Sequence, residues 1–496
     1  MIMWFVPGSS SQDAEAQTDQ RVYEDADCQA GFSHSIEVGL LCPEMDPGAQ
    51  TEGTSLGTPL EPEVDYNRLA AFLRGVCPKV LSELDKVERS RAFRGYDPTD
   101  DDGDDEVKRL HVLLTPELKS RVEVRVSCLA WSCFGRMVAV GYSRPEHESW
   151  CDHNSAVHLF YISRHDFSPS SPGYSLETSS CVTSLAAHPS EPTLIAVGTF
   201  SGEVSVWNVQ WGAQGLVGSS AGSHQEAVSQ LCWVRSPDPS HVRPLLASAG
   251  RDGRLFLWQA EPTLGSFHLL EGFVMTLEHV GGGGGKGSRV QASPLGGRSS
   301  VEVGLTALSF SPHDPASFTV GLEGGGLLRC STLLARQSSV ASVIPLKDPV
   351  LTDYEGHQGT VTCVQHSVHR QDLFLSCDAT EIHLHDVNQA SPLRVIHPAS
   401  EVLGLDWVSS YPHLFIVWGP SGTLEYHSIN NSQTISCPAL LSSEDRDPAP
   451  VTAVVFSPGT AHQLVAVGYV QGRIMVWKVP RVKDPSLGEG FPVEKQ

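Results

Sequence analysis

The side chains best suited to hold a metal lie between His147 and His153. His147, Cys151 and His153 offer two imidazoles and one thiolate, the ligand types that zinc prefers. A structural zinc site has four such ligands, and the sequence spaces no fourth candidate to complete a tetrahedron. The three residues stand in a polar stretch where we expect a surface loop between two strands. We therefore predict no metal and no other cofactor.

A glycine run at residues 281–285 suggests a phosphate-binding loop by its composition. Such loops follow Gly-x-x-x-x-Gly-Lys-Ser/Thr, because their backbone amides cradle phosphates and the hydroxyl binds magnesium. Val280 stands where the first glycine belongs, and Gly287 stands where the hydroxyl belongs. We interpret the run as a solvated linker. We also expect no HExxH helix, GxSxG elbow, kinase-type loop or carboxylate pair, and we predict a protein that is not an enzyme. A site assembled from distant loops stays an open alternative.

The elements that must position these residues repeat between about Leu110 and Val479. Each repeat opens with an alternating strand, continues into a strand of small residues that ends near a glycine, and closes with a strand often ending in tryptophan. A period of roughly 40 to 55 residues is typical of WD-repeat propeller blades. Seven openings predict a seven-bladed, all-β propeller. The openings begin at Val126, Val182, Val228, Leu305, Val361, Val402 and Val451.

One repeat carries four residues at the spacing of a structural tetrad, a chain of hydrogen bonds through one blade. They are His224, Ser248, Asp252 and Trp258, and His357 after Gly356 begins another repeat in the same way. Buried polar chains of this kind hold strands in register, so we interpret the tetrad as structural.

The propeller also needs a strand to close its ring. An unpaired sheet edge invites aggregation, and propellers commonly borrow the last strand from the opposite end of the chain. Residues 111–114 (His-Val-Leu-Leu) are our candidate for that strand. The fourth repeat ends in Leu-Leu-Arg-Cys at residues 327–330, where tryptophan is expected.

The residues before the propeller divide by composition. Residues 1–62 bury too little apolar surface to fold, which predicts a disordered acidic arm. Residues 63–94 place apolar side chains at three- and four-residue steps, which predicts a short amphipathic helix with Asp65 as its N-cap. Pro78 interrupts it, so we expect a kinked helix or two short ones. Residues 95–107 form an acidic linker, residues 108–480 the propeller and residues 481–496 a disordered tail.

The charge of the chain limits its partners. The net charge is -23, and the residues up to 107 hold roughly 23 acidic against roughly 8 basic side chains. An acidic arm repels phosphate backbones and anionic lipid, so we predict no nucleic-acid binding and no direct membrane binding. The 12 cysteines are scattered, without a Cys-x-x-Cys pair, and we expect no secretory leader. These features predict free thiols in a reducing, intracellular compartment.

An acidic arm, a short amphipathic helix and a C-terminal WD propeller, in that order, resemble the dynein intermediate chains. Residues 66–74, 81–84 and 91–93 are similar to the segment before the propeller in intermediate chains of the ciliary motor, cytoplasmic dynein-2. The first repeat and residues 270–273 resemble the same proteins. The resemblance covers about 64 to 479 and is weak in the arm. The arm is shorter than in those proteins, and Pro78 departs from them.

The resemblance implies a non-catalytic motor subunit. In that family, two different WD-repeat intermediate chains seat their propellers on the heavy-chain tail, and light-chain dimers hold their arms together. The implied partners are the dynein-2 heavy chain, the second intermediate chain, light chains of the roadblock, eight-kilodalton and Tctex types, and intraflagellar transport trains. The implied locations are the cytoplasm, cytoskeleton and cilium, including the axoneme and the basal body or centrosome.

Two segments are candidates for light-chain binding. Gln17 and Thr18 are similar to the anchor that adds as an edge strand to the eight-kilodalton light chain, although Ala16 replaces the usual first threonine. The helical stripe suits a roadblock-type light chain or, alternatively, the propeller's rim. Its chief residues are Leu69, Phe72, Leu73, Val76 and Leu84.

A different class of function stays open. Many WD propellers are substrate receptors of ubiquitin ligases, and those commonly show Trp-Asp-x-Arg at a blade end. Here Trp207, Trp258 and Trp477 are followed by Asn, Gln and Lys.

Overall fold

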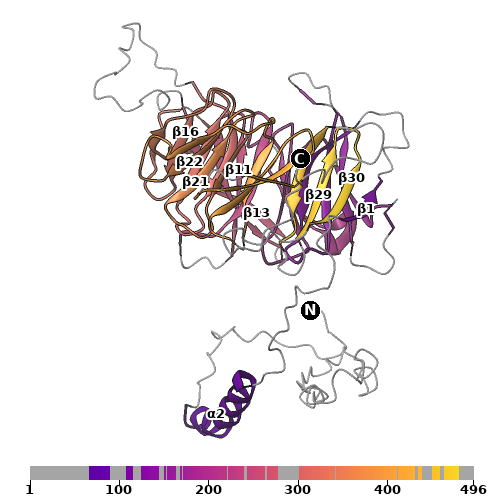
Figure 1. Ribbon diagram of the computed structural model, residues 1–496, viewed down its shortest axis with the longest axis vertical. Coiled ribbons are helices and arrows are strands. Elements are labelled where there is room, and N and C mark those ends of the chain that lie inside the picture. Colours follow the sequence, from indigo (N-terminus) through magenta and orange to yellow (C-terminus); the bar gives the residue numbers. More distant parts are fainter. Residues whose placement is uncertain are drawn as a thin grey trace, which may run out of the picture. The chain divides into compact units, whose positions relative to one another are not determined.

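The computed structural model describes residues 66–89 and most of 108–479. Within the second range it leaves out 115–123, 145–149, 277–300, 438–449 and several shorter stretches. The chain divides into two compact units, residues 1–94 and 95–496. The first contributes the helix α2, Tyr66–Arg89, and the second contributes all the described strands (Figure 1). The predicted arm, linker, tail and glycine-run linker lie outside the described residues.

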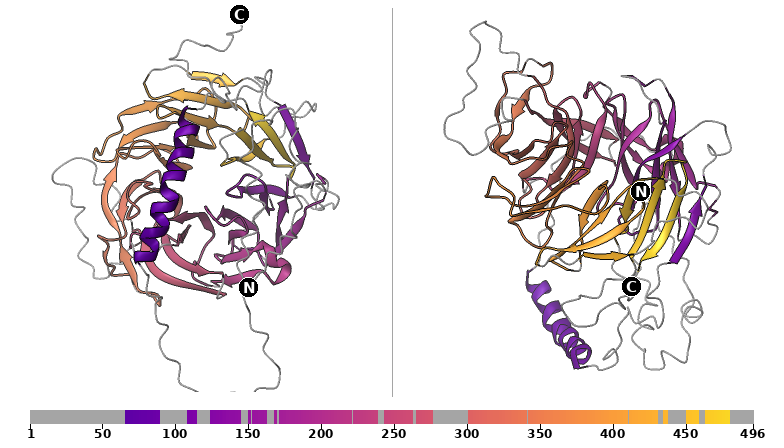
Figure 2. Two further views of the ribbon diagram at one scale, coloured as in Figure 1. Left: turned by 90° about the horizontal axis from the view of Figure 1, so that it is seen from below. Right: turned by 45° about the horizontal axis from the view of Figure 1, so that its top comes forward.

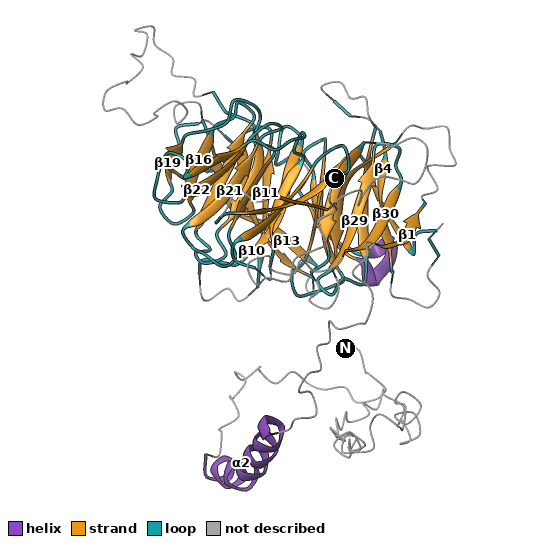
Figure 3. Ribbon diagram, viewed as in Figure 1, coloured by secondary structure: helices purple, strands orange, loops and turns teal. Residues whose placement is uncertain are grey.

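The described strands form seven sheets arranged around a ring, which confirms the predicted seven-bladed, all-β propeller (Figures 2 and 3). The first three blades contain β2 Arg125–Trp131, β3 Val138–Ser143, β4 Ser155–Phe160 and β5 Tyr174–Thr178; β6 Val182–Ala187, β7 Leu194–Thr199, β8 Val204–Asn208 and β9 Leu216–Ser219; and β10 Val228–Val234, β11 Leu245–Gly250, β12 Arg254–Glu261 and β13 Ser266–Val274. A short 3-10 helix, η3 Val209–Gln214, links β8 to β9.

The fourth to seventh blades follow the same order. They contain β14 Leu305–Phe310, β15 Ser317–Leu322, β16 Leu327–Ser331 and β19 Val350–Tyr354; β20 Cys363–His366, β21 Leu373–Cys377, β22 Ile382–Asp386 and β23 Arg394–Ile396; β24 Gly404–Trp407, β25 Leu414–Trp418, β26 Leu424–Ser428 and β27 Thr434–Cys437; and β28 Val451–Phe456, β29 Gln463–Tyr469 and β30 Ile474–Val479 with β1 Lys108–Leu113.

The core of the propeller lies between neighbouring blades. One cluster, for example, joins Val126 and Val140 of blade one to Ala466 and Val476 of blade seven. Strands β3, β7 and β11 are buried along their whole length, because a blade lies against each of their faces. This arrangement explains why the middle strand of each repeat reads as a continuous run of small and apolar residues.

The glycine at the end of such a strand makes room for the next blade. A Cβ on Gly141 would stand 2.7 Å from Val182, and one on Gly198 would stand 2.7 Å from Val228. Real Cβ atoms do not approach another carbon so closely. Both valines open the following blade, so the glycine and the next opening valine form one contact that joins two blades.

Polar groups also link neighbouring blades. The Thr183 hydroxyl donates to the Val228 carbonyl at 2.6 Å, from blade two to blade three. The Trp131 indole N–H donates to the Val455 carbonyl at 3.1 Å, from blade one to blade seven. Equivalent bonds are Ser127 to Val182, Thr306 to Val361, Trp233 to Ala186 and Trp407 to Gln365.

Strand β1 closes the ring, which confirms the candidate closing strand. It pairs antiparallel with β30, from Lys108 opposite Lys478 to Leu113 opposite Ile474, with an irregularity between Arg109 and His111. The strand begins three residues before the predicted segment and ends one residue earlier.

Blade three is wider than the others among the described strands. Strands β17, Arg336–Gln337, and β18, Leu346–Asp348, lie in the connection between β16 and β19 of blade four and extend the sheet of blade three. β18 pairs in parallel with β13 through Gly272 and Phe273, and Lys347 forms a 2.7 Å ion pair with Glu271.

Helix α2 is continuous from Tyr66 to Arg89 and includes Pro78, so the alternative of two short helices is wrong. At 100° per residue, Pro78 lies on the side opposite Leu69 and Val76. A proline removes one backbone donor, and here the remaining hydrogen bonds carry the helix past it. The predicted N-cap, Asp65, lies outside the described residues.

Candidate functional site

The apolar stripe of α2 is open on its surface. Leu69 is 42% exposed, Phe72 61% and Leu73 44%, while Val76 is half-buried. The side chain of Leu84 lies outside the described residues, as do Gln17 and Thr18 of the arm. Exposed apolar groups in such a row mark a surface that gains free energy by binding an apolar partner.

The tetrad residues form one chain of hydrogen bonds inside blade three. His224 Nδ1 lies 3.1 Å from Asp252 Oδ1, and His224 Nε2 lies 2.8 Å from the Ser248 hydroxyl. The Trp258 indole N–H donates to the same hydroxyl at 2.9 Å. Burial would raise the pKa of Asp252, but hydrogen bonds from His224 and from the backbone N–H groups of Gln225 and Arg254 outweigh it and lower that pKa.

This chain has the order Ser–His–Asp, which is also the order of a hydrolase triad. A nucleophile must reach its substrate, however, and the Ser248 hydroxyl is fully buried and already receives the Trp258 N–H. The arrangement supports a structural role, in which each group satisfies the polar requirements of the next.

Blade five contains a shorter chain of this kind, of which only His357 was recognised in the sequence; here His357 Nδ1 lies 3.9 Å from Asp378 Oδ2, too far for a hydrogen bond. His357 Nε2 lies 2.8 Å from the Ser376 hydroxyl, and that hydroxyl lies 3.1 Å from His385 Nε2. Asp378 accepts the Gly359 N–H at 3.1 Å, and His385 stands where blade three has its tryptophan. The aspartate follows the serine by two positions rather than four, which hid the match. A search for any ring donor after the serine would have found it.

Burial dominates the protonation of the blade-five histidines. Burial, followed by the neighbouring His383, lowers the pKa of His357 to about 4. Burial, followed by His383 and His357, lowers the pKa of His385 to about 3. Near neutral pH these rings are uncharged, and they fill the blade as polar aromatic groups.

One sequence expectation is wrong. Residues 218–222 (Gly-Ser-Ser-Ala-Gly) do have the GxSxG spacing of a serine-hydrolase elbow. A working elbow joins a strand to a helix, whereas this segment ends β9 and leads toward β10. The Ser220 hydroxyl lies 3.0 Å from the Ser223 hydroxyl and accepts the Val204 N–H at 3.3 Å. These bonds are those of a turn between strands.

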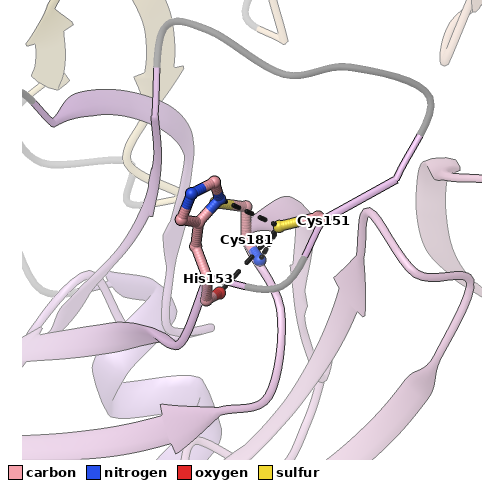
Figure 4. A group of neighbouring side chains, drawn as sticks. All are labelled: Cys151, His153 and Cys181. Atoms are coloured by element: carbon pink, nitrogen blue, oxygen red, sulfur yellow. Dashed lines mark hydrogen bonds between the residues drawn. The ribbon is translucent and has the colours of Figure 1, made fainter.

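The cysteine and histidine weighed as metal ligands come together with a third residue. Cys151 Sγ lies 3.8 Å from His153 Nδ1, and the N–H of Cys181 donates to Cys151 Sγ at 3.5 Å (Figure 4). His147 lies outside the described residues. No local pattern marks Cys181 as a partner of Cys151, because it stands 30 positions away, beyond two further strands.

No protein-family model matches the chain. Cytoplasmic dynein 2 intermediate chain 2 of Homo sapiens is 31% identical to it over 424 residues, 84% of this chain and 77% of that protein. The protein of that name in Mus musculus is 29% identical over 466 residues, 92% of this chain and 84% of that protein. The 78 kDa intermediate chain of the Chlamydomonas reinhardtii flagellar outer arm is 24% identical over 380 residues, 74% of this chain and 50% of that protein.

The chain belongs to the dynein intermediate chain family.

The match to these dynein intermediate chains extends beyond the propeller. The stretch matched to the mouse protein leaves 8% of 496 residues, about 40, outside it. It therefore begins before Tyr66 and includes the whole of α2. The match to the mouse protein thus covers the residues of α2 as well as those of the propeller. In the part of the chain that the structure describes, no helix has the length and apolarity that crossing a membrane requires.

Proposed function

We propose that this dynein intermediate chain is a non-catalytic subunit of the cytoplasmic dynein-2 motor. In this proposal the propeller binds the heavy-chain tail and residues 1–94 bind light chains. The motor carries intraflagellar transport trains from ciliary tip to base and so supports cilium assembly. The observation that carries the proposal is the match to cytoplasmic dynein 2 intermediate chains over most of the chain, which for the mouse protein includes the residues of α2 as well as those of the propeller. A generic propeller adaptor would share only the propeller.

The two units suit two kinds of partner. Propeller faces are rigid and present loops from every blade, which suits the docking of helices from a large protein such as the heavy chain. The arm suits small dimeric light chains, because a dimer that has captured one arm captures a second intramolecularly. The second arm belongs to a different WD-repeat intermediate chain, and ATP hydrolysis belongs to the heavy chain.

We assign the α2 stripe to a roadblock-type light chain. Most of the stability of a helix in a protein comes from packing of its apolar face, and α2 also contains a proline, so an apolar partner would stabilise it. The exposed Leu69, Phe72 and Leu73 are the groups that such a partner would cover. Gln17 and Thr18 are assigned to the eight-kilodalton light chain, and a Tctex-type light chain completes the set. The corresponding locations are the cytoplasm, the cytoskeleton and the cilium, with its axoneme and basal body or centrosome.

Affinity purification from ciliated cells, with mass spectrometry of the partners, tests the proposal. We expect the heavy chain, the second intermediate chain and the light chains to co-purify. Cullin adaptors in place of the heavy chain would identify the protein as a ubiquitin-ligase substrate receptor instead.

A paired variant tests the helix. Phe72→Asp with Leu73→Asp puts two charges into the apolar contact, at a cost of several kcal/mol, and we expect the roadblock-type light chain to be lost. The control, Ala71→Asp with Ser82→Asp, puts two charges on the opposite side of α2 and should retain it. Propeller stability should be the same in both. If the first variant keeps the light chain, or if its propeller melts earlier, the stripe packs on the propeller and the assignment is wrong.

A further inference from the structure

Cys151, His153 and Cys181 meet on blade one from two different loops. Cys151 and His153 precede β4, and Cys181 stands in the turn between β5 and β6. The two sulfurs and one ring nitrogen all lie within 4.8 Å of one another. Figure 4 shows the three residues side by side, with dashed lines from the Cys151 sulfur to the His153 ring and to the Cys181 backbone nitrogen.

These distances are close to those of tetrahedral zinc. With Zn–S near 2.3 Å and Zn–N near 2.0–2.1 Å, neighbouring ligand atoms stand about 3.5–3.8 Å apart. The Cys151 Sγ to His153 Nδ1 distance is 3.8 Å. The other pairs need to approach by no more than about 1 Å, which small rotations of the side chains provide.

The surroundings of Cys151 favour a thiolate, the form that binds metal. Burial opposes ionisation, but hydrogen bonds from Ser180, from the Cys181 N–H and from His153 outweigh it and lower the pKa of Cys151 to about 6. Ser180 is 1% exposed, so this hydroxyl is a buried donor beside the Cys151 sulfur. N–H and O–H groups that donate to a sulfur commonly surround metal-bound thiolates.

The Cys181 thiol is buried beside Cys151 and completes a set of two sulfurs and one imidazole nitrogen within 4.8 Å of one another. Thiolates and imidazoles are the ligands that zinc prefers. A disulfide would satisfy the two sulfurs but would leave the His153 imidazole without a role, and it would need an oxidant.

A hollow on the surface of blade one borders the cluster. Cys181 lines this hollow of about 650 Å³, together with Arg144, Asn154 and Glu177. A water, or a side chain from a bound protein, can reach the ion through it. The neighbouring Trp150, 60% exposed, gives any such protein an apolar contact next to the ion.

We propose that Cys151, His153 and Cys181 form a zinc site on blade one, with the fourth position open. The ion links the loop before β4 to the turn before β6, so it holds these two segments of blade one in a fixed arrangement. This reverses the sequence-based prediction of no metal, in which Cys181 was not considered. The other His-rich cluster, around His357 and His383, is not proposed. The centroids of its two rings are 3.9 Å apart, and the ring planes differ by 19°. The nitrogen lone pairs therefore lie in two nearly parallel planes and do not converge on one ion.

Cobalt and zinc titration of the full-length, metal-free chain tests the site. We expect one equivalent of Co²⁺ to give a near-ultraviolet thiolate-to-cobalt band and the visible bands of tetrahedral geometry, and Zn²⁺ to displace it. Cys151→Ser and Cys181→Ser should each abolish the thiolate band and weaken zinc binding by more than about 100-fold. Cys133→Ser removes another partly exposed thiol of blade one and should change neither result.

A thermal melt gives a second readout that does not depend on the cobalt spectrum. A chelator should lower the melting temperature of the wild-type chain by several degrees and leave that of Cys181→Ser unchanged. A thiolate band that survives in Cys151→Ser, or zinc binding no weaker there than in Cys133→Ser, overturns the proposal. So does a Cys151–Cys181 disulfide, found by peptide mapping, in chain isolated from a reducing compartment.

Discussion

The Ser248 hydroxyl lies at the centre of blade three and has a ring on either side. It bonds to His224 Nε2 and receives the Trp258 N–H, while Asp252 holds the far side of the imidazole. Trp258 also stacks on Phe267, with ring centroids 5.0 Å apart. One hydroxyl thus connects β11, β12 and the loop before β10, and each member of the chain provides a buried neighbour with a hydrogen-bond partner.

Trp258→Ala should lower the free energy of unfolding by about 3–5 kcal/mol, because it removes a buried aromatic ring and leaves Ser248 without a donor. Asp252→Ala should cost about 1–3 kcal/mol, since His224 and the Gln225 N–H lose their acceptor. Urea denaturation measures both. Trp211→Ala, at a tryptophan that is 48% exposed, is the control and should change stability by no more than about 0.5 kcal/mol. Equal effects at Trp258 and Trp211 would rule out a stabilising tetrad.

Buried histidines should make the propeller sensitive to acid. Burial, followed by Arg329 and His313, lowers the pKa of His366 to about 4, and His357 and His385 are lowered to about 4 and about 3. The unfolded chain binds these protons near pH 6.5 and the folded chain does not, so stability is complete above that pH and falls below it. From pH 7 to pH 5 each histidine should cost about 2 kcal/mol.

One buried carboxyl acts in the opposite direction. Burial raises the pKa of Asp406 to about 6, which adds about 1 kcal/mol over the same interval. The three histidines outweigh it. Urea midpoints measured between pH 7 and pH 5 should therefore fall, and His366→Asn should reduce the slope. A midpoint that rises toward pH 5 would show that the histidines titrate normally.

At the scale of the strands, glycine positions decide how closely blades pack. Gly198→Ala should destabilise the propeller by about 1–3 kcal/mol, because its new Cβ would stand 2.7 Å from Val228 and force the blades apart. Gly324→Ala is the matched control, since a Cβ there meets nothing within 4 Å. Thermal or urea melts compare the two. A double-mutant cycle with Val228→Ala should show favourable coupling, and additive effects would place the strain elsewhere.

The elements that the sequence predicted are those with local signals. The alternation of apolar and polar residues and the positions of glycines can be read within a few residues of sequence. These patterns were enough to predict the seven opening strands and β1. Strand β18 has only three residues and pairs in parallel with β13. Strands β14 to β17 lie between the two in the sequence, so no local pattern marks the pairing. The continuous course of α2 through Pro78 depends on a balance of backbone bonds that a pattern does not weigh.

The candidate sites divide in the same way. His224, Ser248, Asp252 and Trp258 stand at family spacing, and their types alone indicated a chain of hydrogen bonds. His385 lies on β22 beside Ser376 of β21, and Cys181 meets Cys151 because two loops of blade one come together, so neither contact has a sequence spacing that marks it. The partners of the α2 stripe could be named only through a family resemblance. A row of apolar side chains indicates a binding surface but does not identify the partner.

For the whole molecule we predict that residues 108–496 resist proteolysis as one unit while residues 1–62 are digested early. Seven blades share their cores with neighbours, so opening one blade exposes two others, whereas the arm's composition offers no core. Limited proteolysis with mass mapping measures the order of cuts. A first cut inside a strand such as β7, with the arm still intact, would contradict the boundary.

The pairing of β1 with β30 has a mechanical consequence. The chain enters the propeller at Lys108, so any tension carried by the preceding residues arrives at the seam that closes the ring. The hydrogen bonds between these antiparallel strands run perpendicular to the strands. A pull along β1 therefore loads all of them at once, whereas a sideways pull breaks them one after another. The same seam is therefore strong in one direction and weak in the other. When the arm transmits load, the angle at which it leaves the propeller determines whether β1 stays paired with β30.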